Sequence, residues 1–109
     1  MQPDFSKPAF SFAALCAVRF RSPGEGGHAG PFHSDYRCQL RYVEEQMDVD
    51  VRIYLIGCES VLAGDESPSV LAFLDCEPER ERCRAGRKFE LREGGIVTGT
   101  GIIHAVATR

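Results

Sequence analysis

Two glycine-rich stretches are the first candidates for chemistry, because loops of this kind hold phosphate groups in many nucleotide-binding proteins. They are Gly24–Gly30, which reads GEGGHAG, and Gly94–Gly101, which reads GGIVTGTG. A P-loop also needs a lysine that reaches the outer phosphate oxygens, and neither stretch is followed by one. A dinucleotide-binding loop must open a helix, whereas strand-like sequence lies on both sides here. We therefore predict no nucleotide cofactor and no nucleotide hydrolysis.

A metal site is the second candidate, because His28, His33, Asp35 and Cys38 lie close together in the sequence. Zinc needs three or four converging ligands. Cys38 is predicted to point inward and both histidines to lie on a loop, so we expect solvated histidines and no metal. The odd number of cysteines and the lack of any CxxC pair favour free thiols in a reducing cytoplasm. The five cysteines are Cys16, Cys38, Cys58, Cys76 and Cys83.

Basic side chains are the third candidate, because they could form a surface that binds anions. Six of them fall within thirteen positions: Arg80, Arg82, Arg84, Arg87, Lys88 and Arg92. Glutamates are interleaved with them, and the chain as a whole has a net charge of −3. An acidic chain is a poor candidate for coating nucleic acid without sequence preference, although a local basic patch remains compatible with it. The chain also lacks a GxSxG nucleophile motif and an obvious pair of catalytic carboxylates, so we predict a binding protein and not an enzyme.

The elements that must position these side chains show mostly the period of two that is typical of strands with one buried face. Tyr36–Val43 alternates most clearly, with Arg37, Gln39 and Arg41 on the outer face. Val70–Cys76 is apolar on both faces, so it is either a central strand or not a strand at all. The predicted strands are 12–20, 36–43, 49–55, 70–76, 87–92 and 96–107. We expect Tyr36, Cys38, Leu40, Val51, Ile53, Phe89 and Leu91 to point inward.

Six short strands without crossover helices predict antiparallel pairing. A closed barrel is favoured because closure removes exposed strand edges, and a sandwich is the alternative. Residues 1–11 are polar and contain two prolines, so we expect a flexible tail before a single domain at 12–109. Pro78–Arg84 can form one helical turn, which Gly86 ends. No apolar run approaches the ~20 residues of a membrane-spanning helix, and no signal peptide is evident at the start of the chain.

Three blocks of the sequence resemble the third, C-terminal domain of translation elongation factor Tu. The block Glu25–Leu40 (EGGHAGPFHSDYRCQL) is similar to the family pattern EGGRxTPFFxGYRPQF. Gly64 and Asp65 stand where the family has a PGD turn. Arg92–Gly95, followed by Gly99 and Gly101, is similar to the family's REGGRTVGAG. The blocks occur in the family's order and at similar spacing across residues 12–107, while the sequence motifs of the family's GTPase domain are missing.

This resemblance implies a six-stranded antiparallel barrel of Greek-key type that carries no catalysis. In the family this barrel helps to hold the T-arm of aminoacyl-tRNA and contacts other proteins. The family's tRNA contacts fall near Gln39, Glu93 and Gly94, and His28 stands where the family has a basic residue. Departures from the family pattern place like charge against RNA, because Glu44, Glu45 and Glu77 replace neutral or basic residues.

We therefore expect partners to meet one polar surface. Its residues are His28, Arg37, Gln39, Arg41, Arg92, Glu93 and Gly94. Two hypotheses follow for the partner. One is tRNA, or a translation-factor protein that elongation factor Tu also contacts. The other is an unrelated protein, bound by an adaptor or inhibitor that kept only the barrel.

Overall fold

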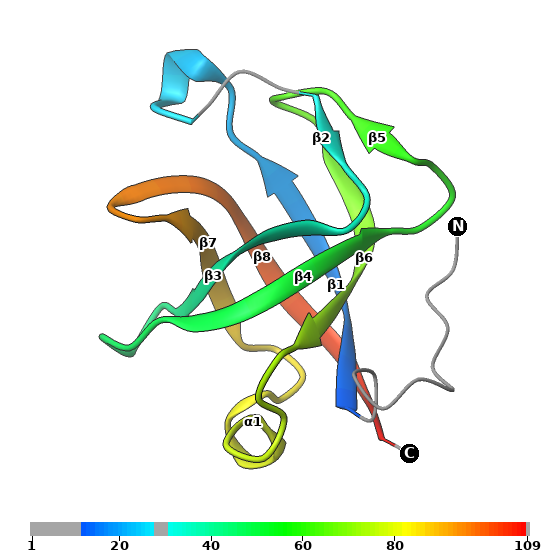
Figure 1. Cartoon of the computed structure of the whole chain (residues 1–109), viewed down its shortest axis with the longest axis vertical. Coiled ribbons are helices and arrows are strands. Elements are labelled where there is room, and N and C mark those ends of the chain that lie inside the picture. Colours follow the sequence, from blue (N-terminus) through cyan, green and yellow to red (C-terminus); the bar gives the residue numbers. More distant parts are fainter. Residues whose placement is uncertain (1–11, 28–30, 109) are drawn as a thin grey trace.

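Six strands of the chain close into one antiparallel barrel. The computed structural model describes residues 12–27 and 31–108. The barrel strands are β1 (Phe12–Phe20), β3 (Tyr36–Tyr42), β4 (Val49–Leu55), β6 (Glu66–Phe73), β7 (Lys88–Glu93) and β8 (Ile96–Thr108). They lie in the order β1-β6-β4-β3-β7-β8, and β8 pairs again with β1 (Figure 1). The predicted closed six-stranded antiparallel barrel is therefore confirmed, and the sandwich alternative is wrong.

The order of the strands is that of a Greek key. β3, β4 and β6 are neighbours in the barrel in the order in which they occur in the sequence. β1, which precedes them in the sequence, lies on the other side of β6. Such an arrangement needs one long connection, which here runs from Phe20 to Tyr36. This connection contains the short 3-10 helix η2 (Pro23–Glu25) and strand β2 (Phe32–His33).

The core contains the side chains that the alternation predicts to point inward. Cys38, Leu40, Val51, Ile53, Phe89 and Leu91 are all buried. Tyr36 lies at the rim of the core and is half-buried, because its hydroxyl group reaches polar partners described below. Phe20 and Phe32 stack at 4.4 Å between ring centroids, so β2 is held against this end of the core.

Three elements, η2, β2 and β5 (Ser60–Val61), were not predicted, because each is too short to show a period. β2 pairs with β5 in a separate two-stranded sheet, and Figure 1 shows this sheet at one end of the barrel. Helix α1 (Glu79–Arg82) lies at the other end, and its single turn agrees with the turn predicted over Pro78–Arg84. The predicted strand Val70–Cys76 is displaced, since β6 begins at Glu66 and ends at Phe73.

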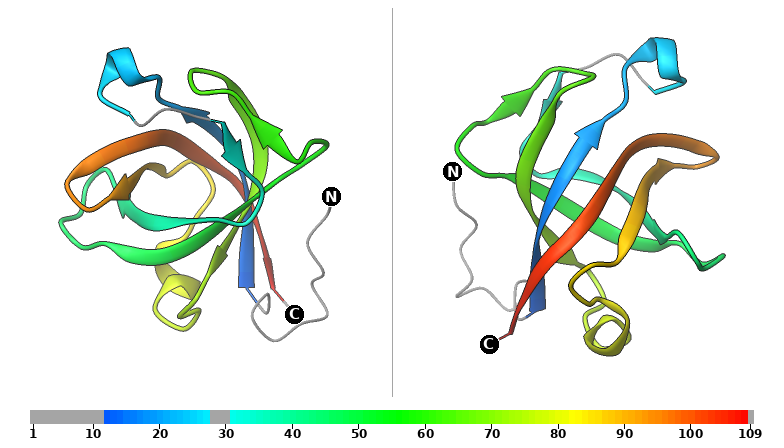
Figure 2. Two further views of the ribbon diagram at one scale, coloured as in Figure 1. Left: turned by 45° about the horizontal axis from the view of Figure 1, so that its top comes forward. Right: turned by 180° about the vertical axis from the view of Figure 1, so that it is seen from behind.

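The outer face of the barrel has two sides of different character. Figure 2 shows β6, β1 and β8 from behind. Many outward side chains of these strands are uncharged, namely those between Ala13 and Ala17 on β1, Pro68, Val70 and Ala72 on β6, and Ile102 and Ala105 on β8. Along β3, β4 and β7 the outward positions are almost all charged or amide side chains. No strand of a closed barrel is central, but Val70 is buried although it points outward, which agrees with the apolar residues on both faces of its strand.

Two sequence predictions lie outside the described residues. These are the flexible tail at 1–11 and the loop position of His28. Among the residues that are described, α1 is the longest helix at four residues, and no helix is long and apolar enough to cross a membrane.

Candidate binding face

The outward side chains of β3 form the centre of the predicted surface. Arg37, Gln39 and Arg41 all point away from the core, as their alternation with Cys38 and Leu40 predicts. The pairing of β3 with β7 places Gln39 beside Arg92. The pairing of β3 with β4 places Gln39 beside Asp50 and Arg37 beside Arg52. The structure therefore brings Arg37, Gln39, Arg41 and Arg92 onto one surface, which we call the β3 face.

Most of the charge on the β3 face is matched by a nearby opposite charge. Arg41 Nε lies 2.7 Å from Asp48 Oδ1, and Arg92 Nη1 lies 2.7 Å from Glu90 Oε1. Asp35 lies between two arginines, 3.8 Å from Arg52 Nε and 4.0 Å from Arg37 Nη2. Asp50 is the fourth carboxylate; it lies beside Gln39 and forms no ion pair with a described residue. With Arg52 included, the face thus contains four arginines and four acids. The face therefore has almost no net charge.

The four arginines differ in how far a partner could reach them. The side chain of Arg37 is 68% exposed and its nearest carboxylate is at the limit of an ion pair. The Arg92 side chain is only 16% exposed, and its Nε atom is buried without a hydrogen-bond partner among the described residues. Arg37 is thus the most accessible cation of the face, whereas Arg92 mainly packs across the sheet.

Glu93 and Gly94 join the β3 face to the turn between β7 and β8. The Tyr36 hydroxyl group donates a hydrogen bond to the Glu93 carboxylate and lies 2.9 Å from Thr98 Oγ1. Burial and the bond to Glu93 raise the pKa of Tyr36 well above its ordinary value. Gly94 has φ +61°, a left-handed conformation that residues with a Cβ rarely adopt. Both residues therefore have a structural reason to be present, in addition to any role in binding.

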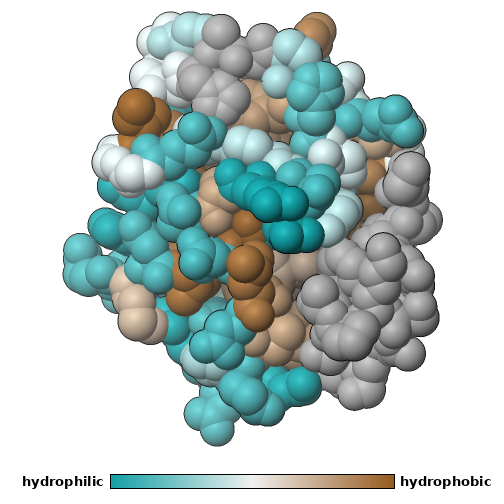
Figure 3. Space-filling view, in the orientation of Figure 1, coloured by the Kyte–Doolittle hydropathy of each residue, from teal (hydrophilic) through white to brown (hydrophobic). Residues whose placement is uncertain are grey.

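Two hollows lie along the β3 face where β6 leaves β4. Leu74 follows the end of β6, its backbone N–H donates to the Asp50 carbonyl group at 3.3 Å, and its side chain is 61% exposed. One hollow, of about 200 Å³, has Leu74 as a wall together with Arg37, Gln39, Asp50 and Arg52. The other, of about 380 Å³, lies between Leu74, Met47, Val49 and Pro78 and extends toward α1. Figure 3 shows hydrophobic atoms near the middle of this side of the molecule, surrounded by hydrophilic ones.

Sequence reasoning did not find these two hollows. Leu74 belongs to a stretch that is apolar on both faces, so nothing in the pattern separates it from its buried neighbours. Pro78 lies just before α1 and close to Leu74 in the sequence, but Met47 lies in the turn after β3 and is far from both. Leu74 becomes exposed beside Met47 and Pro78 only because the pairing between β4 and β6 ends at Phe73.

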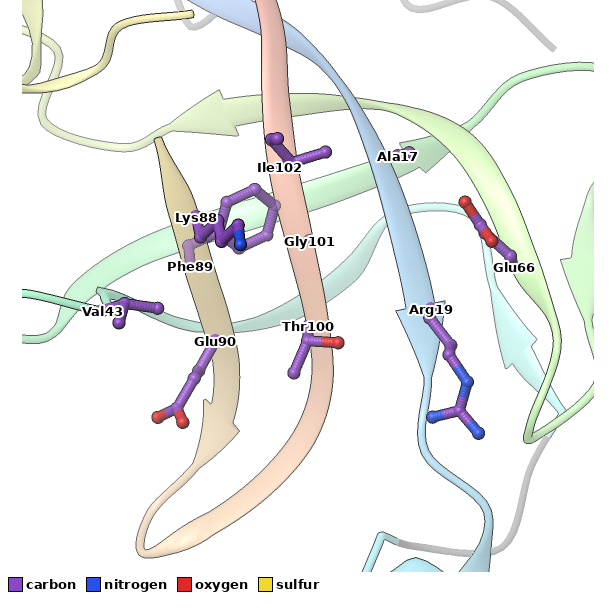
Figure 4. A pocket seen from close by; sticks show the side chains of 10 residues that line it. All are labelled: Ala17, Arg19, Val43, Glu66, Lys88, Phe89, Glu90, Thr100, Gly101 and Ile102. Atoms are coloured by element: carbon purple, nitrogen blue, oxygen red, sulfur yellow. The ribbon is translucent and has the colours of Figure 1, made fainter. Parts of the chain in front are cut away.

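A second groove, of about 420 Å³, crosses β1, β8 and β7 on another side of the barrel (Figure 4). Ala17, Ile102 and Val43 form an apolar strip, and the ring of Phe89 lies behind Gly101. Arg19 and Glu66 flank the strip on the β1 side, and Lys88 and Glu90 flank it on the β7 side. Arg19 is ion-paired with Glu25 at 2.8 Å, and hydrogen bonds from Arg19 and Ser22 lower the pKa of Glu25 to about 2.

A buried polar cluster closes the end of the barrel at α1. Glu79 is only 1% exposed, accepts a hydrogen bond of 2.8 Å from the Tyr42 hydroxyl group, and is ion-paired with Arg82. Glu45 accepts hydrogen bonds from both Arg82 and Arg87, and the Arg87 guanidinium lies 4.2 Å from the centre of the Tyr42 ring. Every charge of this cluster has a partner, so the cluster fastens α1 to the barrel.

The core thiols are chemically quiet. Burial raises the pKa of Cys16 to about 12 and that of Cys38 to about 12, from an ordinary value of 9.0. Burial likewise raises the pKa of Cys83 to about 11. These thiols are therefore neutral and weakly nucleophilic at neutral pH. All five cysteines are free, in agreement with the prediction.

Neither a metal site nor a known family gives this face a function. Within residues 12–27 and 31–108, no group of three or more histidine, cysteine, aspartate or glutamate side chains converges to hold a metal ion. No protein-family model matches the chain. The β3 face and its two hollows therefore have to be interpreted from their own geometry and charge.

Proposed function

We propose that this protein is a non-catalytic binding module and that its β3 face binds another protein. The observation that supports this most strongly is Leu74, an exposed leucine that forms a wall of both hollows and has charged side chains around it. An apolar centre within a polar rim is the usual anatomy of a protein–protein interface. A charged rim also contributes to specificity, because an incorrect partner leaves charges unmatched.

RNA is the less favoured partner on grounds of charge. Binding to phosphate groups requires cations that release counterions on contact, and affinity grows with their number. The four arginines of the β3 face are balanced by acids, and Arg92 is largely covered by its own sheet. Glu45, at a position where the related domain contacts tRNA, is already bound to Arg82 and Arg87.

The translation apparatus is the first place to search for the protein partner. Three sequence blocks resemble the third domain of elongation factor Tu, and a six-stranded antiparallel barrel is the fold that this resemblance implies. That domain contacts other proteins as well as tRNA. The proposal therefore retains a link to translation and assigns the contact to a protein.

An affinity pull-down with ribonuclease as the variable tests this proposal. The protein is immobilised and exposed to a native lysate, with and without ribonuclease. We expect the same protein to be captured in both samples, and to be lost with Leu74→Ser but retained with Val43→Ser. Val43 is the control because it is 58% exposed, lies by the groove of Figure 4 and lines neither of the two hollows beside Leu74.

Three results would count against the proposal. Disappearance of the partner after ribonuclease treatment would make RNA the ligand. Equal loss with Leu74→Ser and Val43→Ser would place the interface elsewhere or spread it over the barrel. Full retention with Leu74→Ser and with the double variant Arg37→Ala, Arg41→Ala would show that the β3 face does not bind.

A further inference from the structure

The larger hollow beside Leu74 combines apolar walls with an acidic border. Met47 and Leu74 are 51% and 61% exposed, and Val49 and Pro78 complete the apolar lining. These side chains come from two segments that are distant in the sequence, residues 47–49 at the start of β4 and residues 74–78 between β6 and α1. Single exposed apolar side chains are common on protein surfaces, whereas convergence of several in one hollow is typical of a binding site. We call this hollow the Leu74 groove.

The charges at the border of the Leu74 groove do not cancel. Asp48 is ion-paired with Arg41, and Arg82 is bound to both Glu45 and Glu79. From the part of the chain that the structure describes, the Asp50 carboxylate receives only a hydrogen bond of 3.4 Å from the neutral amide group of Gln39. Asp75 makes no ion pair or side-chain hydrogen bond among the residues that the structure describes, and it also borders the groove. Two unmatched negative charges therefore flank the exposed leucine.

We propose that the Leu74 groove receives an apolar side chain of a partner protein that carries a lysine or arginine next to it in sequence. The apolar side chain would displace water from Met47, Leu74 and Pro78, which is favourable in proportion to the apolar area removed from water. The neighbouring cation would lie beside Asp50 and Asp75, the carboxylates that form no ion pair with any cation of residues 12–27 and 31–108. This inference rests on the proposed function and specifies the chemistry of the partner segment.

The arrangement also indicates which segments the groove should reject. A segment with glutamate or aspartate beside the apolar residue would place like charge against Asp50 and Asp75. A purely basic segment without an apolar residue would leave Leu74 exposed. Both parts of the partner are therefore needed, and they can be varied independently.

A peptide titration followed by two-dimensional NMR tests the inference without a known partner. The probes are two blocked pentapeptides with a central leucine, flanked by lysines in one and by glutamates in the other. We expect the lysine peptide to shift the backbone amide signals of residues 47–50 and 74–80, and the glutamate peptide to leave them unchanged. Replacing the central leucine of the lysine peptide by serine should remove the shifts.

Two variants separate the contributions of the charges and of the apolar groove. Asp50→Asn together with Asp75→Asn should weaken binding of the lysine peptide by about twofold to fivefold for each charge removed, the range of exposed ion pairs. Leu74→Ser should weaken it further, whereas Val43→Ser should leave it unchanged. Both positions are exposed, so neither change should affect folding.

Specific outcomes would overturn the inference and leave the proposed function intact. Equal binding of both peptides, no shifts with the lysine peptide, or shifts confined to other residues would each contradict a cationic, apolar occupant. If a captured protein partner binds normally to Leu74→Ser but not to Arg37→Ala, Arg41→Ala, the β3 face binds protein without using the Leu74 groove. Loss of the partner in ribonuclease-treated lysate would instead refute the proposed function itself.

Discussion

At the scale of single residues, the barrel needs a glycine where the backbone of β8 passes close to a core side chain and to β1. A Cβ atom placed on Gly101 would lie 2.4 Å from Phe89 Cζ and 2.6 Å from the Ala17 carbonyl oxygen. The Phe89 ring fills the core behind this position and is almost fully buried. The ring can occupy this place only because position 101 has no side chain.

Gly101→Ala should therefore destabilise the protein by about 1–3 kcal/mol, the usual cost of overpacking a core. Urea denaturation followed by circular dichroism measures this change in the free energy of unfolding. Gly95→Ala is the matched control, since nothing lies within 4 Å of a Cβ atom at that position. Equal stability of Gly101→Ala and the wild type would mean that the Phe89 ring moves aside without cost.

The buried thiols make stability depend on alkaline pH. The pKa values of Cys16, Cys38 and Cys83 are about 12, 12 and 11 in the folded protein, against 9.0 ordinarily. Above pH 9 the unfolded chain loses these protons while the folded chain keeps them, so the folded state binds more protons. The free energy of unfolding should then fall as pH rises from about 9 to 11, by up to about 1.4 kcal/mol per thiol and pH unit.

Chemical denaturation at pH 8, 9, 10 and 10.5 measures this dependence. Labelling with iodoacetamide gives an independent check, because Cys58 and Cys76 are half-buried and should react before the three buried thiols. A free energy of unfolding that stays constant from pH 8 to 10.5 would contradict the prediction. So would rapid labelling of all five thiols in the native state.

At the scale of secondary structure, ion pairs decide where the single-turn helix lies. α1 is too short to be stable by itself, so contacts with the barrel must hold it. Tyr42 on β3 binds Glu79, and Glu45 after β3 binds both Arg82 and Arg87. Burial opposes ionisation of Glu45, but the hydrogen bonds from Arg82 and Arg87 lower its pKa below the ordinary value of 4.5. Glu45 therefore stabilises the docked helix when it is ionised.

Glu45→Gln should lower the free energy of unfolding by about 1–2 kcal/mol at pH 7, because two largely covered arginines lose a charged partner. The folded-state pKa of Glu45 is depressed, so its stabilising effect is present above pH 4.5 and is lost as the pH falls further. The difference in the free energy of unfolding between Glu45→Gln and the wild type should thus become smaller below pH 4.5. Glu44→Gln is the control, since Glu44 is exposed and adjacent in sequence.

Denaturant titrations of the three proteins at pH 7 and pH 3.5 provide the measurement. If Glu44→Gln and Glu45→Gln destabilise the protein equally at pH 7, the loss reflects net charge and not the bonds of Glu45. If Glu45→Gln lowers the free energy of unfolding by as much at pH 3.5 as at pH 7, ionised Glu45 does not stabilise the docked helix.

At the scale of the whole molecule, the barrel separates an apolar side from a charged side. The outward positions of β6, β1 and β8 are mainly alanine, valine, leucine and isoleucine, whereas those of β3, β4 and β7 are mainly charged. The charged side is nearly neutral in sum, and the chain as a whole carries a net charge of −3. Long-range attraction of polyanions is therefore weak.

This charge distribution predicts that tRNA binds no more tightly than a non-specific ligand, with a Kd of about 10⁻⁴ M or weaker at physiological salt. Fluorescence anisotropy with labelled tRNA at 50 and 200 mM salt measures both affinity and salt dependence. The double variant Arg37→Ala, Arg41→Ala should have the same weak affinity for tRNA and the same salt dependence as the wild type. Tight binding that weakens steeply with salt, and that the double variant reduces by about one charge per arginine, would identify the protein as an RNA-binding module.

The sequence alone determined the strands and the direction of their side chains. A strand repeats every two residues, so the alternation in Tyr36–Tyr42 and Val49–Leu55 already separates Leu40 and Ile53 from Arg37 and Arg41. A closed antiparallel barrel followed from six such strands without crossover helices. This part of the prediction was reliable because it depends only on neighbours along the chain.

The tertiary structure alone decided which charges are neutralised and where an apolar side chain stays exposed. Asp48 and Arg41, or Glu45 and Arg87, become partners only when the register between strands is set. Leu74 has the same kind of sequence surroundings as buried Phe73, yet it is exposed because β6 ends there and the pairing of β6 with β4 stops at Phe73 and Val51. Charge pairing and exposure depend on residues that are distant in the sequence, and a local periodic pattern contains no information about them.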